Sequence, residues 1–254
     1  MSDFKRDLRL FADGMEIAQG CRLTLTAGSA LTLRPALHHL AVYDLSESSA
    51  ALLSGVHRIE IRSGSSVIAS GELSDELTRV SSGKRIIDLV FSPGLSLWQS
   101  SVSLSVPGGT RVSDTIRSLL SASASSLSLA AFAAEDRPMA RPQTFFGRTC
   151  DALALLADTA EADIWVSSAG ACVSGRSFDN PSYVLTDSDL LSAPVLTGNR
   201  LLVTTAMMGW LIGSFARVEW QGSAWKGRIV SSLIQADNKD GPWKSELEFE
   251  IWNL

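Results

Sequence analysis

The chain has 254 residues, of which 45% are hydrophobic and 19% are charged, and this apolar content is enough for a folded core and excludes intrinsic disorder as the main state. Lys and Arg number 22 against 27 Asp and Glu, which gives a net charge of -5. Proteins that bind nucleic acid by neutralising phosphates carry a basic excess, so this balance argues against a dedicated DNA-binding domain.

Targeting signals are not expected. Residues 1–7 are polar and no apolar run follows them, so we predict no signal peptide. No stretch approaches the roughly 20 apolar residues of a membrane helix, so we predict no membrane segment. The cysteines Cys21, Cys150 and Cys172 stand far apart, which favours buried thiols in a reducing compartment.

Common catalytic and ligand-binding motifs are absent from the sequence. It has no zinc-binding H-E-x-x-H or C-x-x-C, no G-x-S-x-G, no P-loop and no G-x-G-x-x-G. His38 and His39 are neighbours on a predicted strand and therefore face opposite ways, so they cannot bind one metal. We predict no catalytic residue, no cofactor and no metal site, although a carboxylate pair of the glycosidase type stays possible.

The first hundred residues are typical of short strands separated by turns. Asp13-Gly14 is a strong turn signal, and residues 21–26 alternate, with Leu23 and Leu25 on one face. A strand over 39–45 leads into a short helix that begins at Ser46. Further strands are expected at residues 8–11, 58–62, 67–73 and 85–91. This pattern favours a barrel or a sandwich.

The middle of the chain changes character at Pro107. Thr110 is the expected N-cap of a helix, and a second helix opens at Gly147 and Thr149. The apolar face of the first helix is predicted to hold Val112, Ile116, Leu119 and Leu120, and that of the second Cys150, Leu153, Leu156, Ala157 and Ala160. A strand at 164–166 and a turn at Ala169-Gly170 complete a small α/β module.

The last seventy residues return to strands. Strands are expected at 200–205, 213–220 and 225–230, and Leu247, Phe249 and Ile251 then alternate with three glutamates in the final strand. Five of the seven tryptophans lie from Trp210 onward. They fit either the core of a small barrel or a subunit interface, where tryptophan is enriched. The interface candidates are Trp98, Trp210, Trp225 and Trp243.

Four segments of the chain carry a family resemblance. They are residues 40–46, residues 67–73, the pair 109–120 with 146–157 and its following strand, and residues 213–220 with the strand at 227–230. In this order the chain resembles the trimeric baseplate hub proteins of phage tails and related injection machines, the Mu-like and late-control-protein-D-like hubs. The resemblance implies a mainly β fold in which two β-barrel domains related by pseudo-symmetry, residues 1–105 and 184–254, flank an α/β module at 106–183.

The resemblance also implies a function. In such hubs a homotrimer presents six barrels, closes the tail tube and adapts its sixfold symmetry to a threefold tip. The implied partners are a tail tube or distal tail protein ring, a tape measure protein, and a tail fibre or spike protein at the tip. DNA would pass through the hub channel without specific binding. The implied location is the tail of a virion, made in the bacterial cytoplasm, and the implied role is structural.

Two alternative functions and one hypothesis about the charge of the channel accompany this interpretation. The chain could instead be a tail enzyme that degrades cell walls, or a carbohydrate- or receptor-binding β module, which would need exposed tryptophans. The acidic balance suggests that like charge lines the channel and repels DNA phosphates. Glu246, Glu248 and Glu250 form a strand face that could line the channel or face outer solvent.

Overall fold

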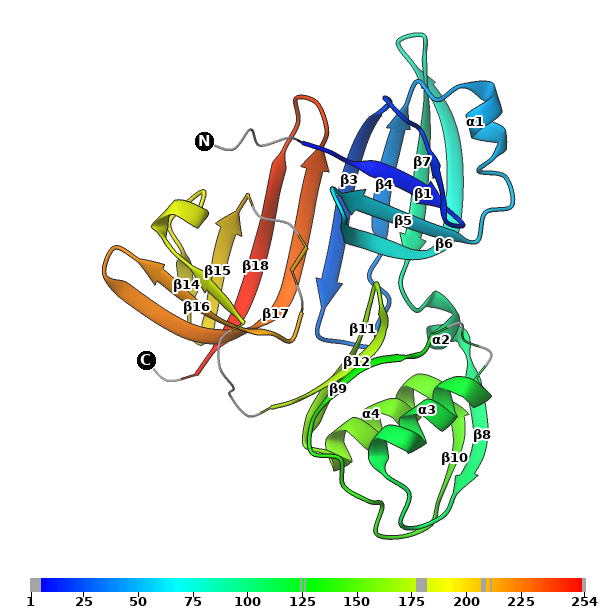
Figure 1. The fold of residues 1–254 in the computed structure, drawn as a ribbon, viewed down its shortest axis with the longest axis vertical. Helices are drawn as coiled ribbons and strands as arrows, with labels where there is room; N and C mark the ends of the chain where they lie inside the picture. The colour runs from blue at the N-terminus through cyan, green and yellow to red at the C-terminus, as the bar shows by residue number, and fades with distance from the viewer. Residues whose placement is uncertain are drawn as a thin grey trace. The chain divides into compact units, whose positions relative to one another are not determined.

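The protein is mainly β with few helices and divides into two compact units (Figure 1). The computed structural model describes residues 6–123, 125, 127–176, 182–206, 209–210 and 212–252. Unit 1 comprises Met1–Ala30, Ala36–Ser92 and Asp179–Leu254, and unit 2 comprises Leu31–Pro35 and Pro93–Phe178. The two terminal regions therefore share one unit, and the middle unit begins at Pro93 instead of the expected 106.

The N-terminal half of unit 1 holds seven strands. They are β1 (Arg9–Ala12), β2 (Met15–Ile17), β3 (Arg22–Ala30), β4 (His38–Tyr43), β5 (Arg58–Ser63), β6 (Ser66–Ser81) and β7 (Lys84–Ser92), with helix α1 (Glu47–Ala51) between β4 and β5. Their spatial order is β3-β4-β7-β6-β5-β1-β2. Ser46 caps α1 as predicted, because its hydroxyl accepts a hydrogen bond from the backbone N–H of Ser49.

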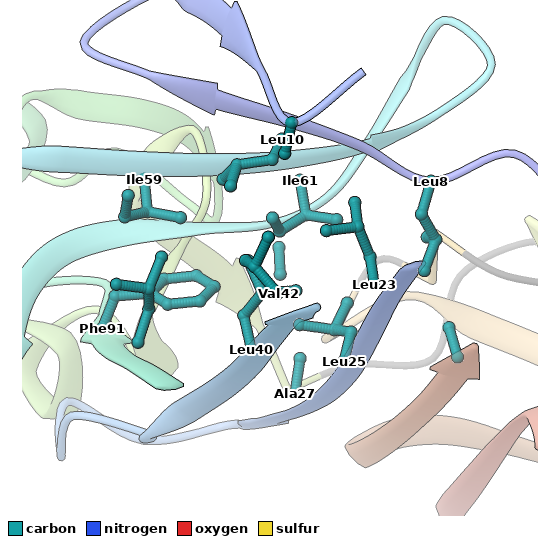
Figure 2. Close-up of a cluster of buried hydrophobic side chains, with 14 of the residues drawn as sticks. Leu8, Leu10, Leu23, Leu25, Ala27, Leu40, Val42, Ile59, Ile61 and Phe91 are labelled. Carbon is teal, nitrogen blue, oxygen red and sulfur yellow. The ribbon is translucent and has the colours of Figure 1, made fainter. Parts of the chain in front are cut away.

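Period-two alternation builds the core of this half (Figure 2). Leu23 and Leu25 of β3 are both fully buried, as predicted, and they pack with side chains of β1, β4, β5 and β7. Strand β6 is long enough to serve two neighbours, since its residues 66–72 pair with β5 and its residues 72–81 pair with β7. It thereby links the strands on both sides of the core.

The C-terminal half of unit 1 holds six strands. They are β13 (Tyr183–Leu185), β14 (Val195–Thr197), β15 (Arg200–Thr205), β16 (Phe215–Trp220), β17 (Ser223–Asp237) and β18 (Trp243–Ile251), with a 3-10 turn η1 (Asp187–Asp189) after β13. Their spatial order is β14-β15-β18-β17-β16-β13. The alternation predicted for the last strand is confirmed, because Leu247 and Phe249 are fully buried and the intervening glutamates are not.

The two halves repeat one strand order. Strands β1, β3, β4, β5, β6 and β7 correspond in chain order and in pairing to β13, β14, β15, β16, β17 and β18. Long β17 behaves as β6 does, since its residues 223–228 pair with β16 and its residues 227–236 with β18. The halves differ in that β2 has no counterpart and β13 runs parallel to β16 whereas β1 runs antiparallel to β5. In addition, the β5–β6 ladder has a bulge between Ile61 and Arg62, and the β16–β17 ladder has none.

The cross-strand registers of the two halves match around the bulge of each long strand. Each long strand carries a bulge, between Leu73 and Asp75 in β6 and between Ile229 and Ser231 in β17. The residue pair just before the bulge contains Phe91 in one half and Phe249 in the other, and both rings are fully buried. Counting back two residues from Leu73 and Ile229 brings Gly71 and Gly227 to the same position. Around these bulges, positions in one half can therefore be matched to positions in the other residue by residue.

The repeated strand order does not by itself show that either half closes into a barrel. Among the described residues no strand pairing joins β1 or β2 back to β3, and the free side of β3 pairs with β17 of the other half. The two halves therefore form one continuous sheet of thirteen strands. Closure of each half into a barrel stays a prediction.

Unit 2 is an α/β module with its own core. Its elements are α2 (Leu95–Gln99), β8 (Ser101–Val106), α3 (Val112–Ala122), β9 (Leu129–Ala133), β10 (Gln143–Arg148), α4 (Thr149–Thr159), β11 (Ala162–Ser167) and β12 (Gly170–Gly175). The apolar faces predicted for α3 and α4 are buried. The cap prediction is wrong, because α3 begins after Arg111 and the Thr110 hydroxyl instead donates to the carbonyl of Pro107. Residues 177–181 of the expected module lie outside the described residues.

Candidate interaction surfaces

The junction between the two halves of unit 1 is an antiparallel ladder. Strand β17 pairs with β3 from Ser231 opposite Ala30 to Asp237 opposite Thr24. On the inner side of this ladder Ile234 and Ala236 of β17 are 5% and 0% exposed and belong to the core of the N-terminal half. The C-terminal half thus supplies part of the core of the N-terminal half.

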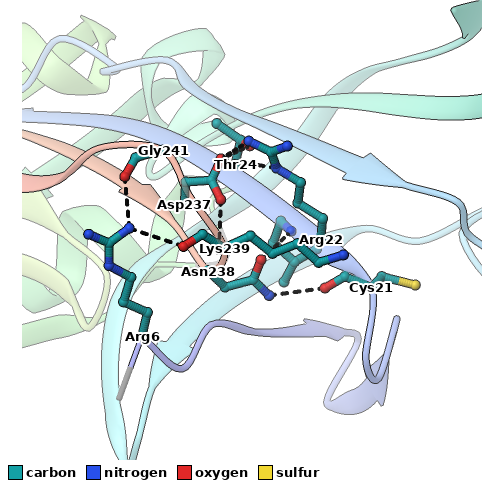
Figure 3. Close-up of polar contacts among 9 residues, drawn as sticks. Arg6, Cys21, Arg22, Thr24, Asp237, Asn238, Lys239 and Gly241 are labelled. Atoms are coloured by element: carbon teal, nitrogen blue, oxygen red, sulfur yellow. Dashed lines mark hydrogen bonds and ion pairs between the residues drawn. The ribbon is translucent and has the colours of Figure 1, made fainter. Parts of the chain in front are cut away.

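A buried carboxylate anchors one end of this junction (Figure 3). The Oδ2 atom of Asp237 accepts hydrogen bonds from the Arg22 guanidinium at 2.6 Å and from the Thr24 hydroxyl at 3.1 Å, and its Oδ1 accepts one from the backbone N–H of Lys239 at 2.8 Å. Next to it, Asn238 donates to the carbonyl of Cys21 at 3.0 Å. The loop after β17 is therefore fixed to the start of β3.

Electrostatics favour the charged form of Asp237. Burial alone would raise the pKa of this carboxyl, but hydrogen bonds from Arg22, from the Lys239 backbone and from Thr24 outweigh burial and hold the pKa below its ordinary value. Gly241 is needed beside it, since a Cβ at that position would lie 2.5 Å from the Asp237 carboxylate. The loop sequence is thus specific for this anchor.

Two strand edges of unit 1 carry exposed apolar side chains. The far segment of β6, residues 74–81, is exposed throughout, and within it Leu77 and Val80 are 60% and 73% exposed. Strand β14 is exposed along its whole length, with Val195 and Leu196 at 56% and 42%. Among the described residues β14 pairs only with β15, and this segment of β6 pairs only with β7. Apolar edges of this kind are typical of sites that pair with another chain.

The four candidate tryptophans do not form one surface. Trp210 and Trp243 are 9% and 8% exposed, and Trp210 packs edge-on against Tyr183 at 5.0 Å. Trp243 belongs to the core of the N-terminal half. Trp225 is half-buried in β17. Trp98 lies in unit 2, half-buried with the Arg148 guanidinium over its ring at 4.6 Å. Contact of these residues with a partner chain stays a prediction.

The histidines are separated as the alternation predicts. His38 is 2% exposed and contacts the ring of Phe91, whereas His39 on the opposite face is exposed. Burial lowers the pKa of His38 to about 4, so the imidazole is neutral at pH 7. Within the described ranges no cluster of three or more His, Cys, Asp or Glu side chains is arranged to hold a metal.

One surface hollow lies at the β16–β17 hairpin. It has a volume of about 450 Å³ and includes Asp187, Arg217 and Glu219 in its lining. Glu219 forms an ion pair with Arg217 at 2.6 Å, and Asp187 accepts a hydrogen bond from the backbone N–H of Gln221 at 3.0 Å. Both carboxylates of the hollow are therefore engaged with groups of the hairpin.

The glutamate face of β18 is partly neutralised. Glu246 pairs with Lys244 at 2.6 Å, and Glu248 accepts a hydrogen bond from the Ser231 hydroxyl at 3.0 Å and lies 3.7 Å from Arg200. The row of glutamates is thus less acidic than its sequence suggests. Across the described residues we find no helix of the length and apolarity needed to cross a membrane.

The sequence did not indicate the exposed edges. The strand expected at 67–73 continues to Ser81, but residues 74–81 lack apolar alternation, and they are exposed throughout among the residues that the structure describes. Leu77 and Val80 are apolar residues among polar and charged neighbours. They indicate an interaction surface only when the strand is known to be a sheet edge.

Solved structures share this fold. The chain aligns with a tail protein from Neisseria meningitidis MC58 at a TM-score of 0.71 and 14% identity, over 97% of each chain. It aligns equally well with the 43 kDa tail protein of prophage MuSo2 from Shewanella oneidensis, at 0.71 and 10% identity over 95% and 97% of the two chains. No protein-family model and no curated protein matches the sequence.

A third similar structure comes from a secretion machine. It is a component of the E. coli type VI secretion system, described as similar to the T4 bacteriophage tail proteins gp27 and gp5. The TM-score is 0.61 with 10% identity, over 96% of this chain and 77% of that one. At these identities the similarity establishes the fold, which is that of phage tail proteins and their secretion-system counterparts.

Proposed function

We propose that the chain is a structural component of a phage or phage-like tail, the hub at the tail tip or baseplate. The observation that carries this proposal is the repeated strand order of the two halves of unit 1, in a fold shared along almost the whole chain with two tail proteins. A protein with two equivalent halves can match a ring of six with three copies, because each copy fills two positions.

The proposed assembly is a homotrimer. Three copies present six equivalent β halves to the sixfold tail tube or distal tail protein ring, and the opposite face receives a threefold fibre or spike. The tape measure protein and the DNA pass through the centre. The net charge of -5 per chain supports passage of DNA without binding, since like charges repel phosphates.

An enzymatic role has less support. The carboxylates of the hollow at the β16–β17 hairpin are tied to hairpin groups, and the similar structures are described as tail and secretion-system proteins. A carbohydrate-binding module would need an exposed aromatic platform, yet Trp210 and Trp243 are buried within their own chain. We therefore assign the chain a structural, non-enzymatic role in the tail.

Labelling of assembled particles tests this role. A C-terminal tag on the full chain, detected by immunogold electron microscopy, should place the label at one end of the tail. Deletion of the coding sequence should abolish complete tails, and expression of the tagged chain should restore them. Label on the capsid or along the whole tube, or normal tails after deletion, would contradict the proposal.

A further inference from the structure

The ladder between β17 and β3 has an unused equivalent in the same chain. Strand β17 uses one side to pair with β18 and the other side to pair with β3. In the repeat, β6 is the equivalent of β17 and β14 is the equivalent of β3. The matching sides of β6 and β14 carry no strand among the described residues. Each chain thus contains one formed ladder, between β17 and β3. It also contains two free strand edges, on β6 and β14, that could form a second ladder of the same kind.

We propose that the outer edge of β6 in one copy pairs antiparallel with the outer edge of β14 in the next copy, as β17 pairs with β3 within the chain. The proposal rests on the proposed function for the number of copies, which is three. The occupant of each edge is a second copy of this chain. Among the described residues, the edge of β17 that is equivalent to the free edge of β6 pairs with β3, and β14 is the equivalent of β3. Such contacts are heterologous, and head-to-tail repetition closes a ring.

The register follows from the repeat. Ser231 is the first paired residue after the bulge in β17, as Asp75 is in β6, so Leu233 and Ile234 correspond to Leu77 and Thr78. Following the pairings from Phe91 through β4 to β3, and from Phe249 through β15 to β14, brings Ala27 and Leu196 to one position. Since Ile234 faces Ala27 in the existing ladder, Thr78 of one copy faces Leu196 of the next.

Burial supports this register. Val80 corresponds to Ala236, and Leu196 corresponds to Ala27. Ala236 and Ala27 are 0% and 2% exposed inside the existing junction, whereas Val80 and Leu196 are 73% and 42% exposed. Pairing the two free edges would cover Leu196 as Ala27 is covered, with Val80 directly beside the paired segment.

The proposed ladder is short. Pro194 stands directly before β14, at the position of Leu25 in β3, and proline has no N–H to donate to a neighbouring strand. Pairing is therefore confined to residues 77–79 against residues 195–197. A proline beside an exposed edge also protects the isolated chain from indiscriminate strand addition.

Disulfide trapping tests the pairing and its register. In the full chain with Cys21→Ser, the double variant Leu77→Cys with Thr197→Cys places two cysteines directly opposite, where Cα atoms about 4.5–5.5 Å apart allow a disulfide. The other native thiols, Cys150 and Cys172, are buried and their pKa values are raised by burial. The matched control, Leu77→Cys with Val195→Cys, is two residues out of register on the same side of the strand.

The expected product after oxidation is a covalent trimer on a non-reducing gel for the in-register variant, at least tenfold more than for the control. Each single-cysteine variant should stay monomeric on that gel. Equal trapping in both double variants, or a dimer from Leu77→Cys alone, would overturn the proposal, the latter because it indicates twofold pairing of β6 with β6. A trimeric mass by light scattering without trapping would overturn the edge pairing and leave the hub role standing. A mass of one chain, together with no disulfide trapping, would contradict both the edge pairing and the hub role.

A charge in the edge gives a second test without oxidation. Leu77→Asp, on a side chain that is 60% exposed inside the proposed ladder, should shift the mass by light scattering from three chains to one, while its far-ultraviolet circular dichroism stays that of the unaltered chain. The control Val67→Asp lies in the same strand on a 37% exposed valine, outside the proposed edge. It should keep the mass of three chains, and an equal loss of trimer in both variants would contradict the edge assignment.

Discussion

The guanidinium of Arg22 donates a hydrogen bond of 2.6 Å to the carboxylate of Asp237, 215 residues further along the chain. This pair joins the start of β3 in the N-terminal half to the end of β17, the long strand of the C-terminal half. Because Asp237 is almost wholly buried, its charge depends on this partner. The pair therefore secures the junction on which the whole arrangement of the two halves depends.

Removing the charge should weaken this junction. Asp237→Asn should lower the free energy of unfolding by roughly 1–3 kcal/mol, because the amide satisfies Arg22 and the Lys239 backbone less well than a carboxylate. Urea unfolding, monitored by tryptophan fluorescence, measures this change in the free energy of unfolding. The control Asp88→Asn removes the exposed pair with Arg79 and should leave the unfolding midpoint nearly unchanged. Equal effects of the two substitutions would contradict the anchoring role.

Acid should destabilise the fold through His38. The folded-state pKa is lowered to about 4, so between pH 6.5 and 4 the unfolded chain binds the proton more readily, and stability falls as the pH falls. The loss amounts to as much as about 3 kcal/mol. In His38→Leu, which places there the residue type of the equivalent Leu201, the unfolding free energy should depend less on pH in this window. If the variant kept the same pH dependence, the loss of stability in acid could not be assigned to His38.

The two buried phenylalanines should behave alike. Phe91→Leu and Phe249→Leu each remove part of a fully buried ring at the same position of the repeat. Each should cost roughly 1–2 kcal/mol of unfolding free energy. Phe146→Leu, on a ring that is 88% exposed, should change it little. Denaturant midpoints measure all three, and a large difference between Phe91 and Phe249 would weaken the equivalence of the halves.

A glycine at the bend of β17 should resist substitution. In Gly227→Ala the new Cβ would lie 2.6 Å from the backbone oxygen of Glu250, which forces β17 and β18 apart. We expect a loss of roughly 1–3 kcal/mol, seen as a lower thermal midpoint. Gly28→Ala is the control in a strand, because its Cβ meets nothing within 4 Å. A midpoint for Gly227→Ala equal to that of the control would show that the strands accommodate the methyl group.

Local patterns in the sequence predicted the elements but not their partners. The alternation around Leu23 and Leu247 identified half-buried strands, and the spacing around Ile116 identified a helix, since burial of one face leaves its period in the sequence. Strand order depends on contacts between distant residues, as between Arg22 and Asp237, and such pairs leave no periodic signal. Thr110 missed its predicted cap because the Pro107 carbonyl accepts its hydroxyl.

The sequence carries less information about contacts between chains than about the fold. The general enrichment of tryptophan at interfaces makes Trp98, Trp210, Trp225 and Trp243 candidates. Trp210 and Trp243 are largely buried within the chain, and contact of the four with a partner chain stays a prediction. The exposed apolar residues Leu77 and Leu196 became recognisable only when the repeat showed that their equivalents lie at a junction. Edge status is a property of the assembled sheet, so composition alone does not reveal it.

Electron cryomicroscopy of the tail, or of the purified oligomer, tests the central claim most directly. The account predicts three copies around the axis, with six β halves alternating between N-terminal and C-terminal and a strand ladder across every boundary. A single copy on the axis, or three copies whose halves do not alternate in one ring, would contradict it.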